Sequence, residues 1–332
     1  MREQIQETSW AFASGRAAVL ESRMLPDEFF ERLIGMEGKE DVVHALGETR
    51  AAEQFRTVED LREAGVRVRQ VYGGIIGKMR ALSPDAAVVG LLDVEKEFRS
   101  LKSHLKREVL GLNVSPVECR FAQEQWSRLW QDLPTDLPPW FDAARRRVLR
   151  ADGWDRDSSV LDAAMDDATL TALVEAAEAT GNEFVAGYFR RYDTVKGVEM
   201  YWRATVLGAQ EAILKLCATG RRDAELFAAM AALPEEDWPR LIGAWLDGIK
   251  QDDLDAPEPE QRVAQFVREA ADWLMAYVRR AKYVPFGAER VFGCVIGLDA
   301  ECYNLALVLA GRGNDVAPDV LRRLLRACYP EQ

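Results

Sequence analysis

The sequence is poor in the residues that carry most metal and acid–base chemistry. It contains two histidines, His44 and His104, and five cysteines, at positions 119, 217, 294, 302 and 328, with no Cys-x-x-Cys pair. Two imidazoles leave little material for histidine catalysis or for a metal cage. An odd number of scattered cysteines indicates neither a disulfide framework nor a zinc site, so we expect reduced, mostly buried thiols in a cytoplasmic protein.

The chain also lacks an excess of positive charge and a long apolar run. Its 55 acidic and 43 basic residues give a net charge of −12, which argues against nonspecific binding to nucleic acid. The opening MREQIQETSW lacks the apolar stretch of a signal peptide. The nearest approach to a transmembrane helix is residues 292–311, but Asp299 and Glu301 interrupt it. We expect a largely buried helix of a soluble protein there.

No motif of a catalytic or nucleotide-binding site is complete. The closest run to a phosphate loop, residues 73–78 (GGIIGK), is one residue short and is followed by Met79 rather than Ser or Thr. We interpret it as a turn or a helix junction. Asp41 and His44 could share one helical face, but a di-iron bundle needs two Glu-x-x-His motifs, which the sequence lacks. We therefore expect no active site, no cofactor and no metal.

Helical periodicity dominates what is present. Residues 160–180, 262–282 and 320–329 are rich in Ala, Leu, Glu and Arg, which are good helix formers. Within the second stretch the apolar side chains recur at i, i+3 and i+4, as on one face of a helix. Pro84 marks a turn and a helix start, and the proline-rich residues 133–139 mark a break. The pattern predicts an all-α protein, and 332 residues allow two or three domains.

Three stretches about 100 residues apart resemble one another faintly. Residues 97–111 read EFRSLKSHLKREVLG, residues 193–208 read DTVKGVEMYWRATVLG, and residues 301–313 read ECYNLALVLAGRG. The first two begin with an acid and end in base-x-x-Val-Leu-Gly, with Lys106 and Arg203 as the base. Internal repetition and chance similarity between amphipathic helices both account for this pattern.

Basic residues gather locally on this acidic chain. One cluster comprises Arg99, Lys102, Lys106 and Arg107 at helical spacing, a second covers residues 145–147 with Arg150, and a third comprises Arg322, Arg323 and Arg326. They are either solvated helix faces with i, i+4 salt bridges or docking surfaces for an acidic partner.

Several segments, taken in order, resemble the C-type subunit family of the V/A-type ATPases (ATP synthases), which is related to the d-type subunit of the eukaryotic vacuolar ATPase. They are residues 12–25, residues 45–50 and the closing stretch 316–329 (VAPDVLRRLLRACY). The family repeats an acid, an Asn three residues later and a base nine residues after the acid. In the first copy Glu97 and Lys106 fit, with Ser100 in place of the Asn. In the second copy Asp193 and Arg203 are ten residues apart, and Lys196 stands at the Asn position. Glu301 and Asn304 fit the third copy.

The resemblance implies an all-helical fold of three similar domains, residues 1–115, 116–215 and 216–332, in a pseudo-threefold funnel. It implies a non-catalytic rotor adaptor at the cytoplasmic face of the membrane, present as a single copy. Its partners would be the central shaft and the proteolipid ring that transports H⁺ or Na⁺. We expect the repeated residues to be structural, and either to pair between helices or to tie helix ends. A helical-repeat scaffold or regulatory interaction protein without a rotary role is the alternative.

Overall fold

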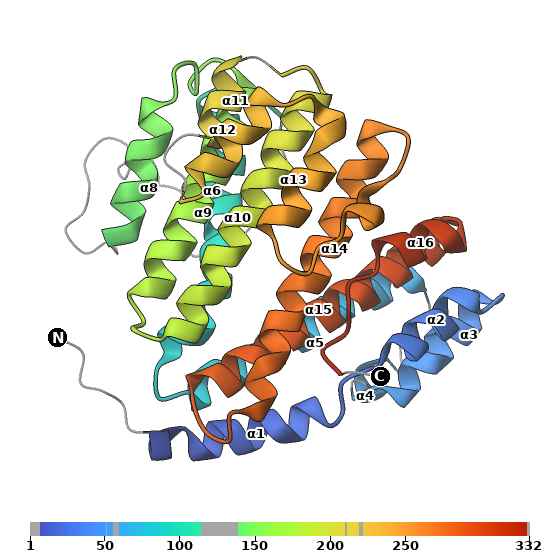
Figure 1. Cartoon of the computed structure of the whole chain (residues 1–332). Helices are drawn as coiled ribbons and strands as arrows, with labels where there is room; N and C mark the ends of the chain where they lie inside the picture. The colour runs from blue at the N-terminus through green and yellow to red at the C-terminus, as the bar shows by residue number, and fades with distance from the viewer. Residues whose placement is uncertain are drawn as a thin grey trace. The chain divides into compact units, whose positions relative to one another are not determined.

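The computed structural model describes residues 7–50, 52–55, 60–113, 139–209, 211–218 and 222–330 (Figure 1). Every regular element within these ranges is a helix and none is a strand, so the all-α prediction is confirmed. The chain forms two compact units, one of residues 1–89 and 268–332 and the other of residues 90–267. The predicted three-domain division stays a prediction.

The first unit is built around one long helix, α15 (Ala288–Gly313), which contacts α1, α2, α3, α5 and α16. Every residue from Val291 to Leu298 is buried. The other elements of this unit are η1 (Glu7–Trp10), α1 (Ala11–Glu21), α2 (Asp27–Gly35), α3 (Lys39–Ala45), η2 (Leu46–Glu48), α4 (Ala52–Phe55), α5 (Leu61–Leu82), η5 (Arg280–Tyr283) and α16 (Pro318–Leu324). A helix that is apolar on all sides must be covered on all sides, which explains this arrangement.

Helix α15 is long and apolar enough to cross a membrane by length and composition alone. However, 78% of its most apolar window is buried within the protein. The expectation of a buried core helix in this region is therefore confirmed. Two glycines of α15 allow other segments to pack closely against it. A Cβ on Gly293 would lie 2.6 Å from Ala281 Cβ, and a Cβ on Gly297 would lie 2.7 Å from Tyr329 Cβ, so neither position has room for a larger residue.

The chain after α16 departs from the prediction. Helical composition predicted a helix over residues 320–329, but α16 ends at Leu324, and Leu325 is extended, with φ −62° and ψ 143°. Three successive backbone amides then donate to side chains of other helices: Arg326 to Asn304, Ala327 to Asp272 and Cys328 to Asp27. These side chains supply the hydrogen bonds that a continued helix would have made, so tertiary contacts override local propensity.

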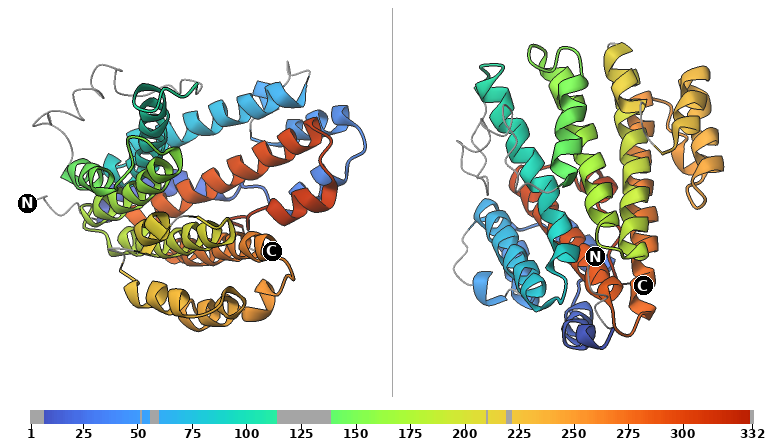
Figure 2. Two further views of the ribbon diagram at one scale, coloured as in Figure 1. Left: turned by 90° about the horizontal axis from the view of Figure 1, so that it is seen from above. Right: turned by 90° about the vertical axis from the view of Figure 1, so that its left-hand side faces the viewer.

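The second unit is a bundle in which α9 (Ser158–Glu178) contacts α8 (Pro139–Arg150), α10 (Glu183–Val206) and α11 (Glu211–Ala218). Figure 2 shows α9 and α10 side by side. Side-chain caps begin both helices, since Asp157 accepts from Ser159 N and Asn182 accepts from Val185 N. The remaining elements are α6 (Ala86–Glu108), α12 (Ala224–Ala232), η3 (Glu235–Asp237), α13 (Trp238–Trp245), η4 (Gln251–Leu254) and α14 (Pro259–Arg279), of which α6 and α14 also extend into the residues of the first unit.

Two local predictions have different outcomes. Residues 73–78 lie inside α5, so their interpretation as a turn or helix junction is wrong. The helix instead begins after Asp60, whose carboxylate caps Glu63 N, and it tolerates the interior glycines because the rest of its face is packed. The turn at Pro84 is confirmed, since it separates α5 from α6. Most of the proline-rich stretch 133–139 lies outside the described residues, and Pro139 begins α8.

Candidate functional site

The third copy of the repeated motif contains a buried carboxylate that ties four segments together. The Glu301 side chain is 3% exposed and accepts from Leu25 N at 2.7 Å, from the Tyr72 hydroxyl, and from Arg50 Nη2 at 3.2 Å. Burial raises the pKa of Glu301, while Arg50, Tyr72 and the Leu25 amide act to lower it. Burial and the neighbouring Glu301 raise the pKa of Tyr72. The cluster therefore joins these four segments as a structural clamp.

Asn304 lies one turn further along α15 and is fully buried. Its amide Nδ2 donates to Arg326 O at 2.8 Å, and its Oδ1 accepts from Arg326 N at 3.0 Å. The Arg326 guanidinium lies over the Tyr303 ring, 3.6 Å from its centre. Asn304 thus holds the extended C-terminal segment, and Arg326 of the third basic cluster packs onto α15.

The first copy places Lys106 between two helices. Its Nζ lies 2.7 Å from Asp162 of α9, and Lys102 on the same face of α6 lies 2.5 Å from Asp166. The expected partner helix could not be named from sequence, because the pairs are 56 and 64 residues apart. Of the other motif residues on α6, Ser100 is buried and Glu97 is half-buried.

In the second copy the residues behave differently. Asp193 is buried within α10, but Arg203 is exposed and pairs with Glu199 one turn earlier on the same helix, at 2.9 Å. Arg203 thus pairs within its own helix, whereas Lys106 pairs between helices. Lys196, at the place where the family has Asn, pairs with the same Glu199 at 2.7 Å.

A groove in the second unit brings three of the predicted residues together. It has a volume of about 500 Å³ and is lined by α6, α9, α10 and α11, with Arg99, Lys102 and Arg203 among its lining. Apolar side chains of α9 and α11 form much of the remaining surface, and Leu207 at its edge is 79% exposed. A lining that combines apolar and charged side chains suits a contact with another protein.

The basic clusters are largely neutralised within the chain. Arg99 pairs with Glu95 at 2.9 Å, one turn away, and Arg107 contacts His104 Nδ1 at 3.5 Å. In the second cluster, Arg147 makes a two-pronged contact with the buried Asp167 of α9 at 2.5 and 2.9 Å. These cations are thus engaged in packing helices as well as in facing solvent.

The third cluster, near the C-terminus, shows the same behaviour. Arg322 pairs with Glu31 and with Asp319, both at 2.8 Å, and Arg323 donates to Asp319 O at 3.2 Å. The contact with Glu31 joins α16 to α2. Docking of an acidic partner at these clusters stays a prediction.

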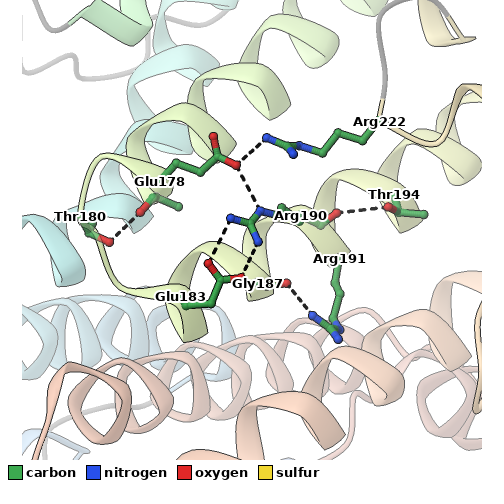
Figure 3. Close-up of polar contacts among 9 residues, drawn as sticks. Glu178, Thr180, Glu183, Gly187, Arg190, Arg191, Thr194 and Arg222 are labelled. Carbon is green, nitrogen blue, oxygen red and sulfur yellow. Dashed lines mark hydrogen bonds and ion pairs between the residues drawn. The ribbon is translucent and has the colours of Figure 1, made fainter.

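Sequence reasoning missed an ion network at the turn between α9 and α10 (Figure 3). Arg190 contacts Glu178 at 3.1 Å and Glu183 at 2.6 Å, and Arg222 contacts Glu178 at 2.5 Å. The hydrogen bond with Arg190 lowers the pKa of the exposed Glu183. The signal in the sequence was an acid seven residues before an arginine, on one face of a helix. The network fixes the α9–α10 turn to the segment before α12.

Nothing in the described ranges has the chemistry of a metal centre. No group of three or more His, Cys, Asp or Glu side chains in those ranges could hold a metal ion. His44 lies exposed near the end of α3, and His104 lies on α6 beside Arg107. The polar clusters found here join helices to one another.

Comparison with known proteins places the chain in one family. No curated protein matches it. Residues 13–324 match the ATP synthase (C/AC39) subunit family, so the match covers nearly every helix described above. The chain therefore belongs to the ATP synthase (C/AC39) subunit family, whose members are non-catalytic subunits of V/A-type rotary ATPases.

Proposed function

We propose that this chain is the rotor adaptor of a prokaryotic V/A-type ATPase or ATP synthase, coupling the central shaft to the membrane proteolipid ring. The family match over residues 13–324 is the observation that carries the proposal. In this role a single copy lies at the cytoplasmic face of the membrane, with three similar helical domains forming a funnel. Torque passes through it from the shaft to the ring, and the ring moves H⁺ or Na⁺; in synthesis the sequence reverses.

The packing of α15 suits a part that carries torque. Its buried length is covered by several helices, and Glu301 joins it to α5, to Leu25 and to Arg50. Close-packed protein interiors have low compressibility and transmit strain. A clamp of charge-assisted hydrogen bonds at the centre of the unit further resists sliding between these helices.

The groove of the second unit supplies a contact surface for a partner in the complex. Its apolar lining and the exposed Leu207 would bury apolar surface against a helix of the shaft, and its charged lining residues would set the orientation of that helix. Leu207→Asp places a charge there without disturbing buried packing. Leu149→Asp is the matched control, because Leu149 is an exposed leucine of the same unit and does not line the groove.

The test is reconstitution of the whole rotary complex with and without this subunit. We expect the detached catalytic head to hydrolyse ATP while ATP-driven ion transport stops, and transport to fall with Leu207→Asp but not with Leu149→Asp. Unchanged coupled transport in the complete absence of the subunit would favour the alternative, a helical scaffold without a rotary role. ATP hydrolysis by the isolated chain would contradict both.

A further inference from the structure

The charged residues that line a groove in the first unit are all basic. The groove lies between α1 and α5 and has a volume of about 480 Å³. Its charged lining residues are Arg16, Arg23, Arg50, Arg67 and Lys78, and no acidic residue of the described chain lines it. Five cations gathered on a protein of net charge −12 create a local field opposite in sign to the rest of the molecule.

Most of these cations differ from the predicted basic clusters in lacking internal partners. No carboxylate in the described ranges pairs with Arg16, Arg23 or Lys78. Arg67 has one weak contact, with Glu63 on the same helix at 3.4 Å. Positive charges held side by side without counter-charges repel one another, so an anion placed among them is favourable.

Arg50 also lines the groove, but its side chain is largely buried. Its side chain is 6% exposed, and its Nη2 donates to Glu301 and to Arg23 O. Its Nε and Nη1 are buried and have no acceptor within the part of the chain that the structure describes. Buried polar groups are nearly always hydrogen-bonded. These two donors lie on different edges of the guanidinium and are closed to solvent, so Arg50 contributes positive charge to the groove and not a paired hydrogen bond.

Helix α5 presents an open strip along this groove. Arg67, Val71, Gly74 and Lys78 follow one another at intervals of three or four residues, so they lie on one face. A Cβ on Gly74 would meet no atom within 4 Å. Glycine weakens a helix interior, and no packed neighbour requires it here. Its effect is to leave space for a ligand between the two ends of the strip.

We propose that the groove between α1 and α5 binds a phosphate-bearing anion, with Arg16, Arg23 and Lys78 holding the phosphate oxygens and Arg50 adding positive charge beside them. The ligand is either a free phosphate compound or the headgroup of an anionic lipid, since both present the same oxygens. The proposal does not depend on the rotary role.

The first arm of the test titrates inorganic pyrophosphate into the full-length chain by calorimetry. We expect saturable binding with one site per chain. Arg23→Gln and Lys78→Gln should each weaken it about tenfold, the loss typical of one charge-assisted hydrogen bond. Gly74→Leu should weaken it by filling the groove without changing charge. The controls are Arg69→Gln and Gly73→Leu, which alter exposed positions of α5 that do not line the groove.

The second arm measures cosedimentation with vesicles of phosphatidylglycerol and phosphatidylcholine, compared with phosphatidylcholine alone. Binding to the anionic vesicles that Gly74→Leu and Lys78→Gln abolish identifies a lipid headgroup, whereas pyrophosphate binding without vesicle binding identifies a free phosphate compound. Arg50→Gln is avoided, because it would leave Glu301 buried without its cation. Absence of binding in both arms, or equal losses in the groove variants and their controls, would overturn the proposal.

Discussion

Asn304→Ala tests whether side chains of the first unit hold the C-terminal segment. Asn304 is fully buried and makes both hydrogen bonds to the backbone of Arg326, at 2.8 and 3.0 Å. Each such bond contributes about 1 kcal/mol, and an unpaired buried group costs about 1–3 kcal/mol more. Arg326 is half-buried, so water can replace part of this loss. We expect opening of the segment to become easier by about 2–3 kcal/mol.

Hydrogen exchange measured by mass spectrometry on C-terminal peptides gives the readout. A loss of about 2–3 kcal/mol corresponds to a roughly 30- to 150-fold fall in protection. The amides of Arg326, Ala327 and Cys328 should accelerate together, because each is held by a side chain of another helix. Asn304→Asp should be no better than alanine, since it turns a carboxylate oxygen toward the Arg326 carbonyl and buries a charge.

The matched control is Asn314→Ala. Asn314 is an exposed asparagine just after the end of the same helix, and its Nδ2 donates to Ala310 O at 2.7 Å without touching the segment. We expect it to leave the three amides unchanged. Protection within twofold of the native protein in Asn304→Ala would show that apolar packing around Tyr329, and not the amide clamp, holds the segment.

Three further changes probe other links in the structure. Gly297→Ala should lower the free energy of unfolding by about 1–3 kcal/mol in urea titrations, because the new methyl group overlaps Tyr329 Cβ. Gly73→Ala should raise the free energy of unfolding by up to about 1 kcal/mol, because a Cβ there meets no atom within 4 Å and alanine favours the helix. Equal effects of the two variants would contradict the packing argument. Lys106→Gln should lower the free energy of unfolding by about 0.5–1 kcal/mol at low salt and by less in 1 M salt, because the ion pair of Lys106 with Asp162 of α9 is partly exposed. A loss of stability that does not depend on salt would indicate that Lys106 acts through packing instead. Asp272→Asn keeps an acceptor for the C-terminal segment and removes a carboxyl whose pKa burial raises. The stabilisation tied to that raised pKa is complete below about pH 3.9 and is lost as the pH rises through the higher pKa of the folded protein. The variant should therefore gain stability relative to the native chain as the pH rises above about 3.9; a difference that falls with pH would refute this.

Much of the fold could be predicted from the sequence because helix formation is governed by local patterns. Helix-forming composition indicated α9, apolar spacing indicated α14, and proline marked the boundary between α5 and α6. Asp299 and Glu301 interrupt the apolar run, and this indicated that α15 is a buried helix of the protein and not a transmembrane helix. Ordered similarities in several weak motifs also indicated the family, which the match over residues 13–324 confirms.

Contacts between distant residues were decided only by the tertiary structure. Glu301 and Leu25 are 276 residues apart in the chain, and no local pattern indicates their hydrogen bond. The residues after Leu324 have helical composition but are extended, because buried side chains compete successfully for their amides. The cations of the α1–α5 groove are scattered over residues 16–78 and gather only when the two helices pack. Helical periodicity selects the face that each helix buries, but the choice of partner for that face is a property of the whole packed unit.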